Sequence, residues 1–204
     1  MKLFQRLPET LTVDGKRYRV NLDFRNVLRL VDILGRADLL PASREYLALK
    51  CVMKRPPRNT TPVLAALREL LFPPEESKGH SSPNAPKLTD YAQDADLIRA
   101  AFLQAYGINL WRDKLHWFEF SALLANLPEG TRYADVISIR ARPMPEPTKH
   151  NAKERQWLME AKARYALRMT PEEEESRLQA SLHATTQSLL ALAKRGSDKQ
   201  HGEK

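Results

Sequence analysis

The sequence predicts a mainly α protein, with a compact domain of short helices, an N-terminal β-hairpin and a long amphipathic C-terminal helix. Three observations support this fold class. Apolar residues recur at helical spacing through most of the chain. The 14 prolines fall mostly between these periodic segments, where they punctuate helices, and only 7 glycines are present. The single strong strand signal, Asp14-Gly15, lies near the start.

The domain organisation follows from the same pattern. We expect one helical domain over residues 1–168 of the 204-residue chain. Within it, residues 73–88 are dominated by Pro, Ser, Gly and Asn, which predicts a mobile linker. We expect residues 169–204 to form an amphipathic helix followed by a disordered tail.

The hairpin is expected over residues 11–22. Asp14 and Gly15 suit a type I′ turn, because both central positions of that turn need positive φ. Apolar and polar residues alternate from Tyr18 to Leu22, which predicts one buried face. An isolated hairpin is only marginally stable in water, so this one is expected to pack on the helices that follow.

Three short helices are expected after the hairpin. The first runs from an N-cap at Asp23 to Gly35, the second begins with Pro41, and the third uses Thr61 as its cap. Their predicted buried stripes are, in chain order, Val27, Leu30, Val31 and Leu34; Tyr46, Leu49 and Met53; and Leu64, Leu67, Leu70 and Leu71.

Three further helices are expected beyond the linker. The first ends at Gly107, and "TRYADVISIRA" is a short amphipathic segment that suits one more helix. "KERQWLMEAKARYAL" follows the break at "RPMPEP". The buried faces are expected to include Ile98, Ala101, Phe102 and Ala105 in the first, Tyr133, Val136, Ile137 and Ile139 in the second, and Trp157, Leu158, Ala161 and Tyr165 in the third.

The segment "LHWFEFSALLANLP", residues 115–128, predicts the most buried helix of the domain. In a helix starting near Asp113 it is apolar nearly all round. His116 and Glu119 are adjacent on that helix, but a metal site needs at least three protein ligands and no other histidine has a helpful spacing. We therefore expect His116 and Trp117 to be structural, with the His116 ring bonded to a backbone carbonyl and to Glu119.

No other pattern in the chain indicates catalysis. The sequence has no dinucleotide fingerprint, phosphate loop or nucleophile elbow. Cys51 follows "YLALK" on an apolar helix face, which favours a place in the core over a role as nucleophile. We expect a protein that is not an enzyme, with no catalytic residue, no cofactor and no metal.

Composition and charge restrict the compartment and the partners. Cys51 is the only cysteine, which excludes an internal disulfide and favours a reducing cytoplasm. No signal peptide and no membrane span are expected. The net charge of +8 lies mostly at the two ends, which would attract an acidic protein surface or a nucleic acid. The densest patches, "KRYR" and "MKRPPR", lack the aromatic platform of single-strand binders.

The C-terminal helix, residues 170–195, is the candidate partner-binding element. Its apolar residues follow a coiled-coil spacing of 4, 3, 4 and 3 over about two heptads, which is too short to be stable alone. We expect a partner or a second copy of the chain to cover this seam, with packing on the domain as the alternative. The seam consists of Leu178, Leu182, Leu189 and Leu192, with Thr185 between them.

Three segments of the central block form a recognisable set: the "AAFLQAYGINL" run at 100–110, "LHWFEFSALLANLP" at 115–128, and "ISIR" at 137–140. Together they resemble the bacteriophage gene-product-fifteen family. "NLDFRNVLRLVDIL" and "NAKERQWLMEAKARYAL" are similar to the opening and closing helices of that family. The resemblance covers roughly residues 18–168, and the Pro/Ser-rich linker and the helix at 170–195 depart from the pattern.

The resemblance implies a function in phage assembly. The family belongs to long-tailed phages and prophages, and its genes lie between those of the tail tube and the tape measure. It implies a tail assembly chaperone in the cytoplasm of the bacterial host, which binds the tape-measure protein and the tail-tube subunits. A nucleic-acid-binding regulator, suggested by charge alone, is the alternative. A structural tail component or an enzyme without a recognisable site is the third possibility.

Overall fold

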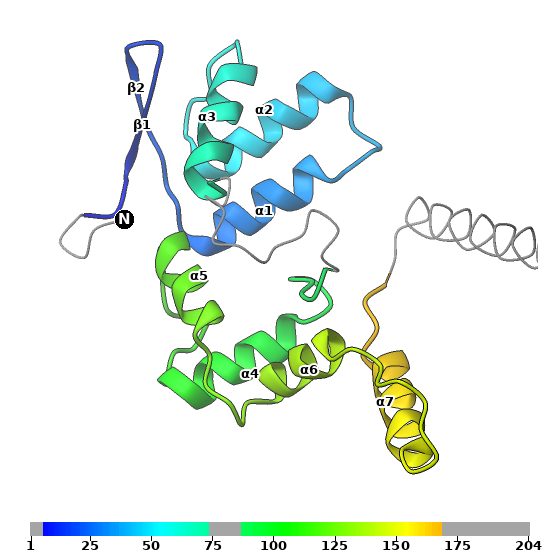
Figure 1. Ribbon diagram of the computed structural model, residues 1–204. Helices are drawn as coiled ribbons and strands as arrows, with labels where there is room; N and C mark the ends of the chain where they lie inside the picture. Colours follow the sequence, from blue (N-terminus) through cyan, green and yellow to red (C-terminus); the bar gives the residue numbers. More distant parts are fainter. Residues whose placement is uncertain (1–5, 74–86, 169–204) are drawn as a thin grey trace, which may run out of the picture. The chain divides into compact units, whose positions relative to one another are not determined.

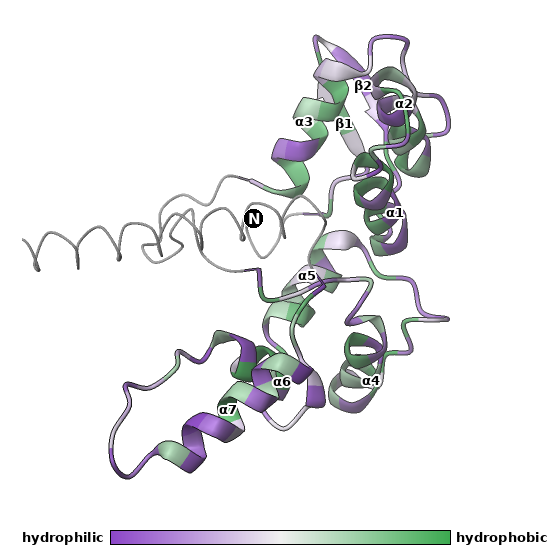
Figure 2. Cartoon of the chain, turned by 90° about the vertical axis from the view of Figure 1, so that its right-hand side faces the viewer, coloured by the Kyte–Doolittle hydropathy of each residue, from purple (hydrophilic) through white to green (hydrophobic). Residues whose placement is uncertain are grey.

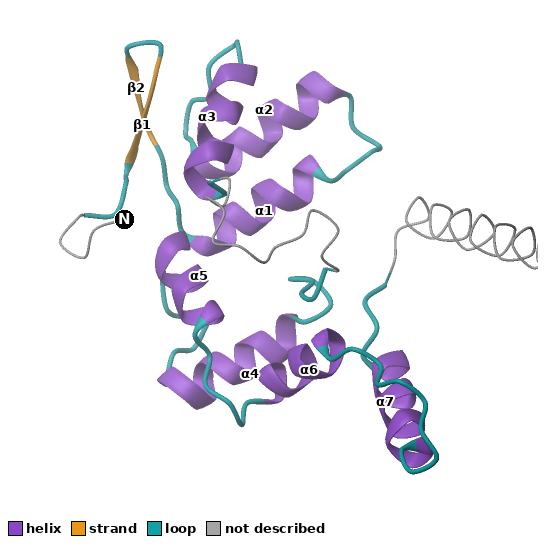
Figure 3. Cartoon of the chain, viewed as in Figure 1, coloured by secondary structure: helices purple, strands orange, loops and turns teal. Residues whose placement is uncertain are grey.

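The computed structural model describes residues 6–73 and 87–168, in which seven helices follow a two-stranded hairpin (Figures 1 and 3). The mainly helical fold with an N-terminal hairpin is therefore confirmed. Most of the predicted linker, and the predicted C-terminal helix with Leu178, Leu182, Leu189 and Leu192, lie outside the described residues. The described residues up to Tyr165 group together by their contacts.

The hairpin consists of β1 (Thr10–Val13) and β2 (Lys16–Arg19), paired antiparallel. Asp14 has φ of 49° and Gly15 has φ of 73°, so both central positions have the positive φ of a type I′ turn, as predicted. The strands are shorter than the predicted hairpin, because beyond Val20, whose amide still donates to the Glu9 carbonyl (2.8 Å), the Asn21 amide donates to the Val52 carbonyl instead (2.8 Å).

Three helices follow: α1 (Phe24–Leu34), α2 (Pro41–Val52) and α3 (Thr61–Leu71). α1 packs on α2, α2 on α3, and α3 against β1. The prediction that Val31 and Tyr46 lie in the core is wrong, since each is 40% exposed. Tyr46 lies off the buried face of α2. That face has the i, i+1, i+4 spacing of one helical stripe and consists of Ala48, Leu49 and Val52.

The start of α3 lies one residue earlier than predicted. The N-cap is Thr60 rather than Thr61, and its side chain does not cap the helix. Instead the Thr60 hydroxyl donates a 2.6 Å hydrogen bond to the carboxylate of Glu45 on α2. A bond between the two helices therefore replaces the local cap that the sequence suggested.

The other four helices are α4 (Ala95–Tyr106), α5 (Trp117–Ala125), α6 (Arg132–Ala141) and α7 (Ala152–Arg164). α4 contacts α5 and α6, and α6 contacts α7. Gly107 ends α4 with φ of 67°, as predicted. In the predominantly polar α7 (Figure 2), Leu158 is fully buried but Trp157 is 54% exposed. The prediction that Trp157 belongs to the buried face of α7 is therefore wrong.

α5 differs from its prediction in start and burial. It begins at Trp117 instead of near Asp113, and only Trp117 and Phe120 are buried. The residues before it pair with the segment before α1: the Phe24 amide donates to the Leu115 carbonyl (3.0 Å), and the Trp117 amide donates to the Leu22 carbonyl (2.7 Å). This short antiparallel bridge holds His116 in an extended conformation and starts α5 only at Trp117, and the helix has one buried face.

An aromatic cluster fills the space beside this bridge. The rings of Phe24 and Phe120 stack with centroids 4.6 Å apart, and Phe102 stacks on Phe120 at 5.3 Å. Trp117 lies edge-on to Phe72 at 5.5 Å. The cluster joins helices α1, α4 and α5, and offset aromatic pairs of this kind add stability beyond the area that they bury.

A buried ion pair fixes α6 to the start of α4. Arg140 binds both carboxylate oxygens of Asp94, at 2.7 and 2.8 Å, and the two side chains are 7% and 1% exposed. The same guanidinium donates to the carbonyls of Leu88 (2.8 Å) and Tyr165 (2.6 Å). Arg140 therefore connects three segments that are distant in sequence.

Candidate protein-binding groove

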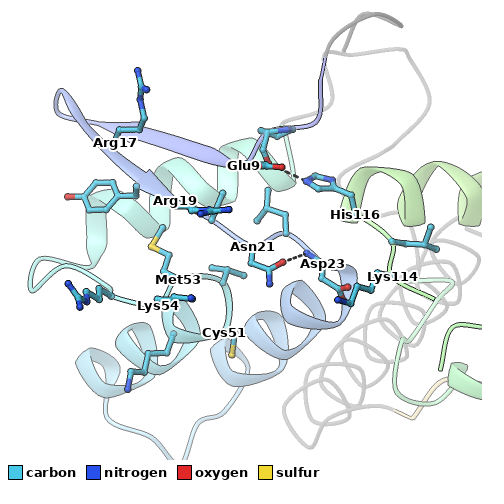
Figure 4. Close-up of a pocket in the computed structure, with 18 residues that line it drawn as sticks. Glu9, Arg17, Arg19, Asn21, Asp23, Cys51, Met53, Lys54, Lys114 and His116 are labelled. Atoms are coloured by element: carbon cyan, nitrogen blue, oxygen red, sulfur yellow. Dashed lines mark hydrogen bonds between the residues drawn. The ribbon is translucent and has the colours of Figure 1, made fainter. Parts of the chain in front are cut away.

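His116 is the N-cap of α5. Its Nδ1 accepts from the Phe118 amide at 3.3 Å, and its Nε2 lies 3.3 Å from the carbonyl of Pro8 (Figure 4). The Glu119 carboxylate accepts from the backbone amide of His116 at 3.0 Å, which completes a capping box. The predicted carbonyl contact is confirmed. The predicted bond between the ring and Glu119 is wrong, because Glu119 binds the backbone instead.

Cys51, near the end of α2, is the chain's one cysteine. Burial raises the pKa of the Cys51 thiol, which disfavours the thiolate that a nucleophile requires. Cys51 is half-buried and lies at the wall of a groove, so its predicted place in the core is only partly correct. Within residues 6–73 and 87–168, no group of three or more His, Cys, Asp and Glu side chains is arranged to hold a metal ion.

The structure does contain an apolar groove between α1 and α4, with a volume of about 440 Å³. Its walls come from both helices, the loop after α4 and the aromatic cluster. It is lined by Phe24, Arg25, Leu28, Arg29, Tyr91, Ala95, Ile98, Arg99, Leu110, Trp111 and Phe120. An apolar floor with a rim of three arginines has the composition that protein-binding surfaces favour. We call it the α1/α4 groove.

Trp111 is the most exposed aromatic residue of this groove. Its side chain is 70% exposed, whereas Tyr91 is 39% exposed and Phe120 is buried. The Arg99 guanidinium lies over the indole ring, 3.9 Å from the ring centroid, and also binds Asp96 at 2.8 Å. A stacked Arg–Trp pair presents a large apolar surface together with hydrogen-bond donors, and both residue types are enriched among interface hot spots.

The loop that carries Trp111 is held in place by its own polar residues. The Asn109 side chain accepts from the Trp111 amide (3.0 Å), and the Asp113 carboxylate accepts from the Asn109 amide (2.7 Å). Arg25 of α1 donates to the carbonyls of Leu110 (3.0 Å) and Asp113 (2.5 Å). Trp111 therefore stands on a braced loop, which lowers the entropy lost when a partner binds.

Sequence reasoning missed this groove. The predicted partner-binding residues, Leu178, Leu182, Leu189 and Leu192, lie outside the described residues, so the structure does not test them. The signal for the groove is the Trp111-Arg112-Asp113 sequence, which places a tryptophan in a short polar loop after the helix stop at Gly107. A tryptophan without helical or strand periodicity around it is a candidate for a surface role.

Comparison with known families matches residues 3–167 to the bacteriophage Gp15 protein. That match covers most of the 204 residues. The chain belongs to the bacteriophage Gp15 protein family. It is therefore a phage protein, and the resemblance seen in the sequence is confirmed. No curated protein and no solved structure matches this member of the Gp15 family.

The residues that carried the resemblance mostly build the fold. In this Gp15 protein, Gly107 ends α4, His116 caps α5 and Arg140 holds the buried ion pair. Trp111 lies within the same block and is exposed. Over residues 6–73 and 87–168, no helix is long and apolar enough to cross a membrane.

Proposed function

We propose that this Gp15 protein is a tail assembly chaperone that binds the tape-measure protein, and tail-tube subunits, in the cytoplasm of the bacterial host. It acts by binding, without catalysis. The α1/α4 groove takes the apolar face of a tape-measure helix and shields it until the tail tube forms around the tape measure. The observation that supports this proposal is the exposed Trp111 on a braced loop beside an apolar groove, in a chain of a phage protein family.

The chemistry of the groove suits a helical client. An amphipathic helix presents apolar side chains at i, i+3, i+4 and i+7, and a hydrophobic groove receives that stripe. Leu28, Ile98 and the aromatic rings supply the apolar floor. Arg29, which is exposed at the rim, can pair with a carboxylate that flanks the stripe of an amphipathic helix. The tape-measure helix can also leave the α1/α4 groove again, because the groove is open to solvent and does not enclose the helix.

The test is binding of the purified full-length chain to the tape-measure protein of the same phage. Trp111→Ala should weaken binding about tenfold or more, as truncation of a hot-spot tryptophan does. Trp157→Ala is the matched control, because Trp157 is also exposed but lies on α7, outside the groove. Equal affinity of the two variants would contradict the proposed site. Failure of the wild-type chain to bind would contradict the function.

A salt series separates this function from the nucleic-acid alternative. Phosphate contacts make affinity fall steeply with salt, whereas burial of apolar surface does not. We expect binding of the tape-measure protein to change little between low and physiological salt. A steep decrease, together with tighter binding to DNA of unrelated sequence, would favour the regulator.

A further inference from the structure

A second groove lies on the other side of α1's start, beside the hairpin, with a volume of about 910 Å³. Figure 4 shows β2 along one wall and the end of α2, with Met53 and Lys54, along the other. Lys114 and His116 lie at one end. No residue lines both this groove and the α1/α4 groove. We call it the hairpin groove.

The edge of β2 that points away from β1 faces the hairpin groove. Val13 pairs with Lys16 next to the two-residue turn, and the Val20 amide donates to the Glu9 carbonyl at 2.8 Å. These are hydrogen-bonded pairs, and such pairs alternate along an antiparallel ladder. The backbone N–H and C=O groups of Arg17 and Arg19 therefore point away from β1, and within the described residues no backbone group accepts or donates to them.

The chain itself begins to cover this edge and then turns away. The Asn21 amide points away from β1, as the amides of Arg17 and Arg19 do, and donates to the Val52 carbonyl at 2.8 Å. Met53 is extended, with φ of −132° and ψ of 135°. The chain then bends at Lys54 and Arg55. One backbone hydrogen bond thus marks where a neighbouring strand would run, and no segment among residues 6–73 and 87–168 pairs with β2 beside Arg17 and Arg19.

The charge of the hairpin groove selects an acidic occupant. Its lining includes six exposed cationic side chains and two carboxylates, of which Asp23 already caps α1. Within the described residues, none of the six has a carboxylate partner. Basic edge strands resist pairing with their own kind, which disfavours a second copy of the chain joined edge to edge. The six are Arg17, Arg19, Lys50, Lys54, Arg55 and Lys114.

We propose that the hairpin groove binds an extended acidic segment of a protein partner, which adds to the edge of β2 as a third strand. Strand addition uses backbone hydrogen bonds for affinity and alternate side chains for selectivity. Alternating N–H and C=O groups suit a polypeptide, whereas a nucleic acid offers phosphates that only accept. Carboxylates on alternate positions of the added strand lie near Arg17 and Arg19. This site is independent of the proposed binding of the tape-measure protein.

The probe is a fluorescein-labelled octapeptide of alternating glutamate and threonine, titrated with the full-length chain at low salt. Fluorescence anisotropy should show saturable binding. An octapeptide of alternating lysine and threonine should not bind. The glutamate peptide with N-methyl groups on alternate amides should bind at least about fivefold more weakly, because it loses backbone hydrogen bonds worth about 1 kcal/mol each.

Two pairs of variants separate charge from backbone pairing. Arg17→Glu with Arg19→Glu should weaken binding about tenfold, whereas Arg58→Glu with Arg112→Glu, an equal charge change on exposed residues outside the groove, should have little effect. Arg19→Ala removes only the charge. Arg19→Pro removes the same charge and also the outward N–H, and proline is tolerated at such an edge position. Arg19→Pro should therefore bind more weakly than Arg19→Ala.

Three results would overturn the proposal: no binding of the glutamate peptide, equal binding of the N-methylated and unmodified peptides, or tighter binding of an eight-nucleotide oligothymidine that depends on Arg17 and Arg19. The peptide comparison does not depend on whether Arg19→Pro folds. Trp111→Ala should leave peptide binding unchanged, so loss of this site and loss of the proposed chaperone function are distinguishable.

Discussion

The guanidinium of Arg140 shows how much one side chain can hold in this fold. It binds Asp94 in a bidentate pair and donates to two carbonyls outside α6. Removing one partner of a buried pair leaves the other charge without compensation, and this costs more than the pair itself contributes. The four bonds therefore make Arg140 a structural residue of the Gp15 fold.

Arg140→Met should lower the free energy of unfolding by about 3–5 kcal/mol, because Asp94 stays buried without its partner. Urea denaturation measures the change. Arg142→Met is the control, since Arg142 and Glu154 are about half exposed and form a surface pair at 2.7 Å, for which about 1 kcal/mol or less is expected. Equal effects of the two substitutions would contradict a buried role for Arg140.

Trp117 is the largest side chain of the aromatic cluster. Trp117→Ala should destabilise the protein by about 3–5 kcal/mol, because it removes buried ring contacts and leaves a cavity. The indole N–H also loses its 3.3 Å bond to the Leu71 carbonyl. Thermal unfolding compares this variant with Trp157→Ala, which should change the melting temperature little. A small effect of Trp117→Ala would show that the cluster is not the centre of the core.

The cap at His116 can be separated from metal binding. His116→Ala should lower stability by about 1 kcal/mol, whereas His116→Asn should retain most of it, because asparagine is a good N-cap. Incubation with EDTA should leave the unfolding midpoint of the wild-type chain unchanged. A midpoint that falls on chelation would contradict the capping role.

At the level of elements, local signals predicted the hairpin and the helices well, while contacts distant in sequence decided the rest. The turn at Asp14-Gly15 and the stop at Gly107 need positive φ, which the residue types themselves indicate. The start of α5 could not be read locally, because the bridge to the segment before α1 decides it. The periodicity of α5 likewise could not show that only one of its apolar faces is buried.

Gly107→Ala tests the αL end of α4. A Cβ at Gly107 would meet no atom within 4 Å, so the whole effect comes from φ of 67°. We expect a loss of about 1–2 kcal/mol. Gly35→Ala is the comparison, because Gly35 has φ of −77° and a Cβ there would have only ordinary contacts. Equal losses at the two positions would contradict backbone strain as the cause.

At the level of the whole molecule, two grooves on one helical fold give this Gp15 protein two chemically different surfaces. The α1/α4 groove is apolar with an arginine rim, and the hairpin groove is basic with an open strand edge. The sequence predicted a protein-binding role through resemblance, but it could not locate either groove. Each groove is formed by segments that only the tertiary contacts bring together, such as α1 with the loop after α4.

The family match ends at residue 167. A chain truncated after Leu167 should therefore retain cooperative unfolding with little change in midpoint, measured by circular dichroism. If the C-terminal segment binds partners, the truncated chain should lose self-association or some affinity for the tape-measure protein. Unfolding or aggregation of the truncated chain would show that this segment belongs to the core.

Site-specific photocrosslinking tests the central claim most directly. Benzoylphenylalanine is placed at position 111 or, as the control, at position 157, in the full-length chain co-expressed with the tape-measure protein. We predict a crosslink to the tape-measure protein from position 111 and none from position 157. A crosslink from position 157 alone, or from neither position while the proteins still co-purify, would contradict the proposal that the α1/α4 groove holds the tape measure.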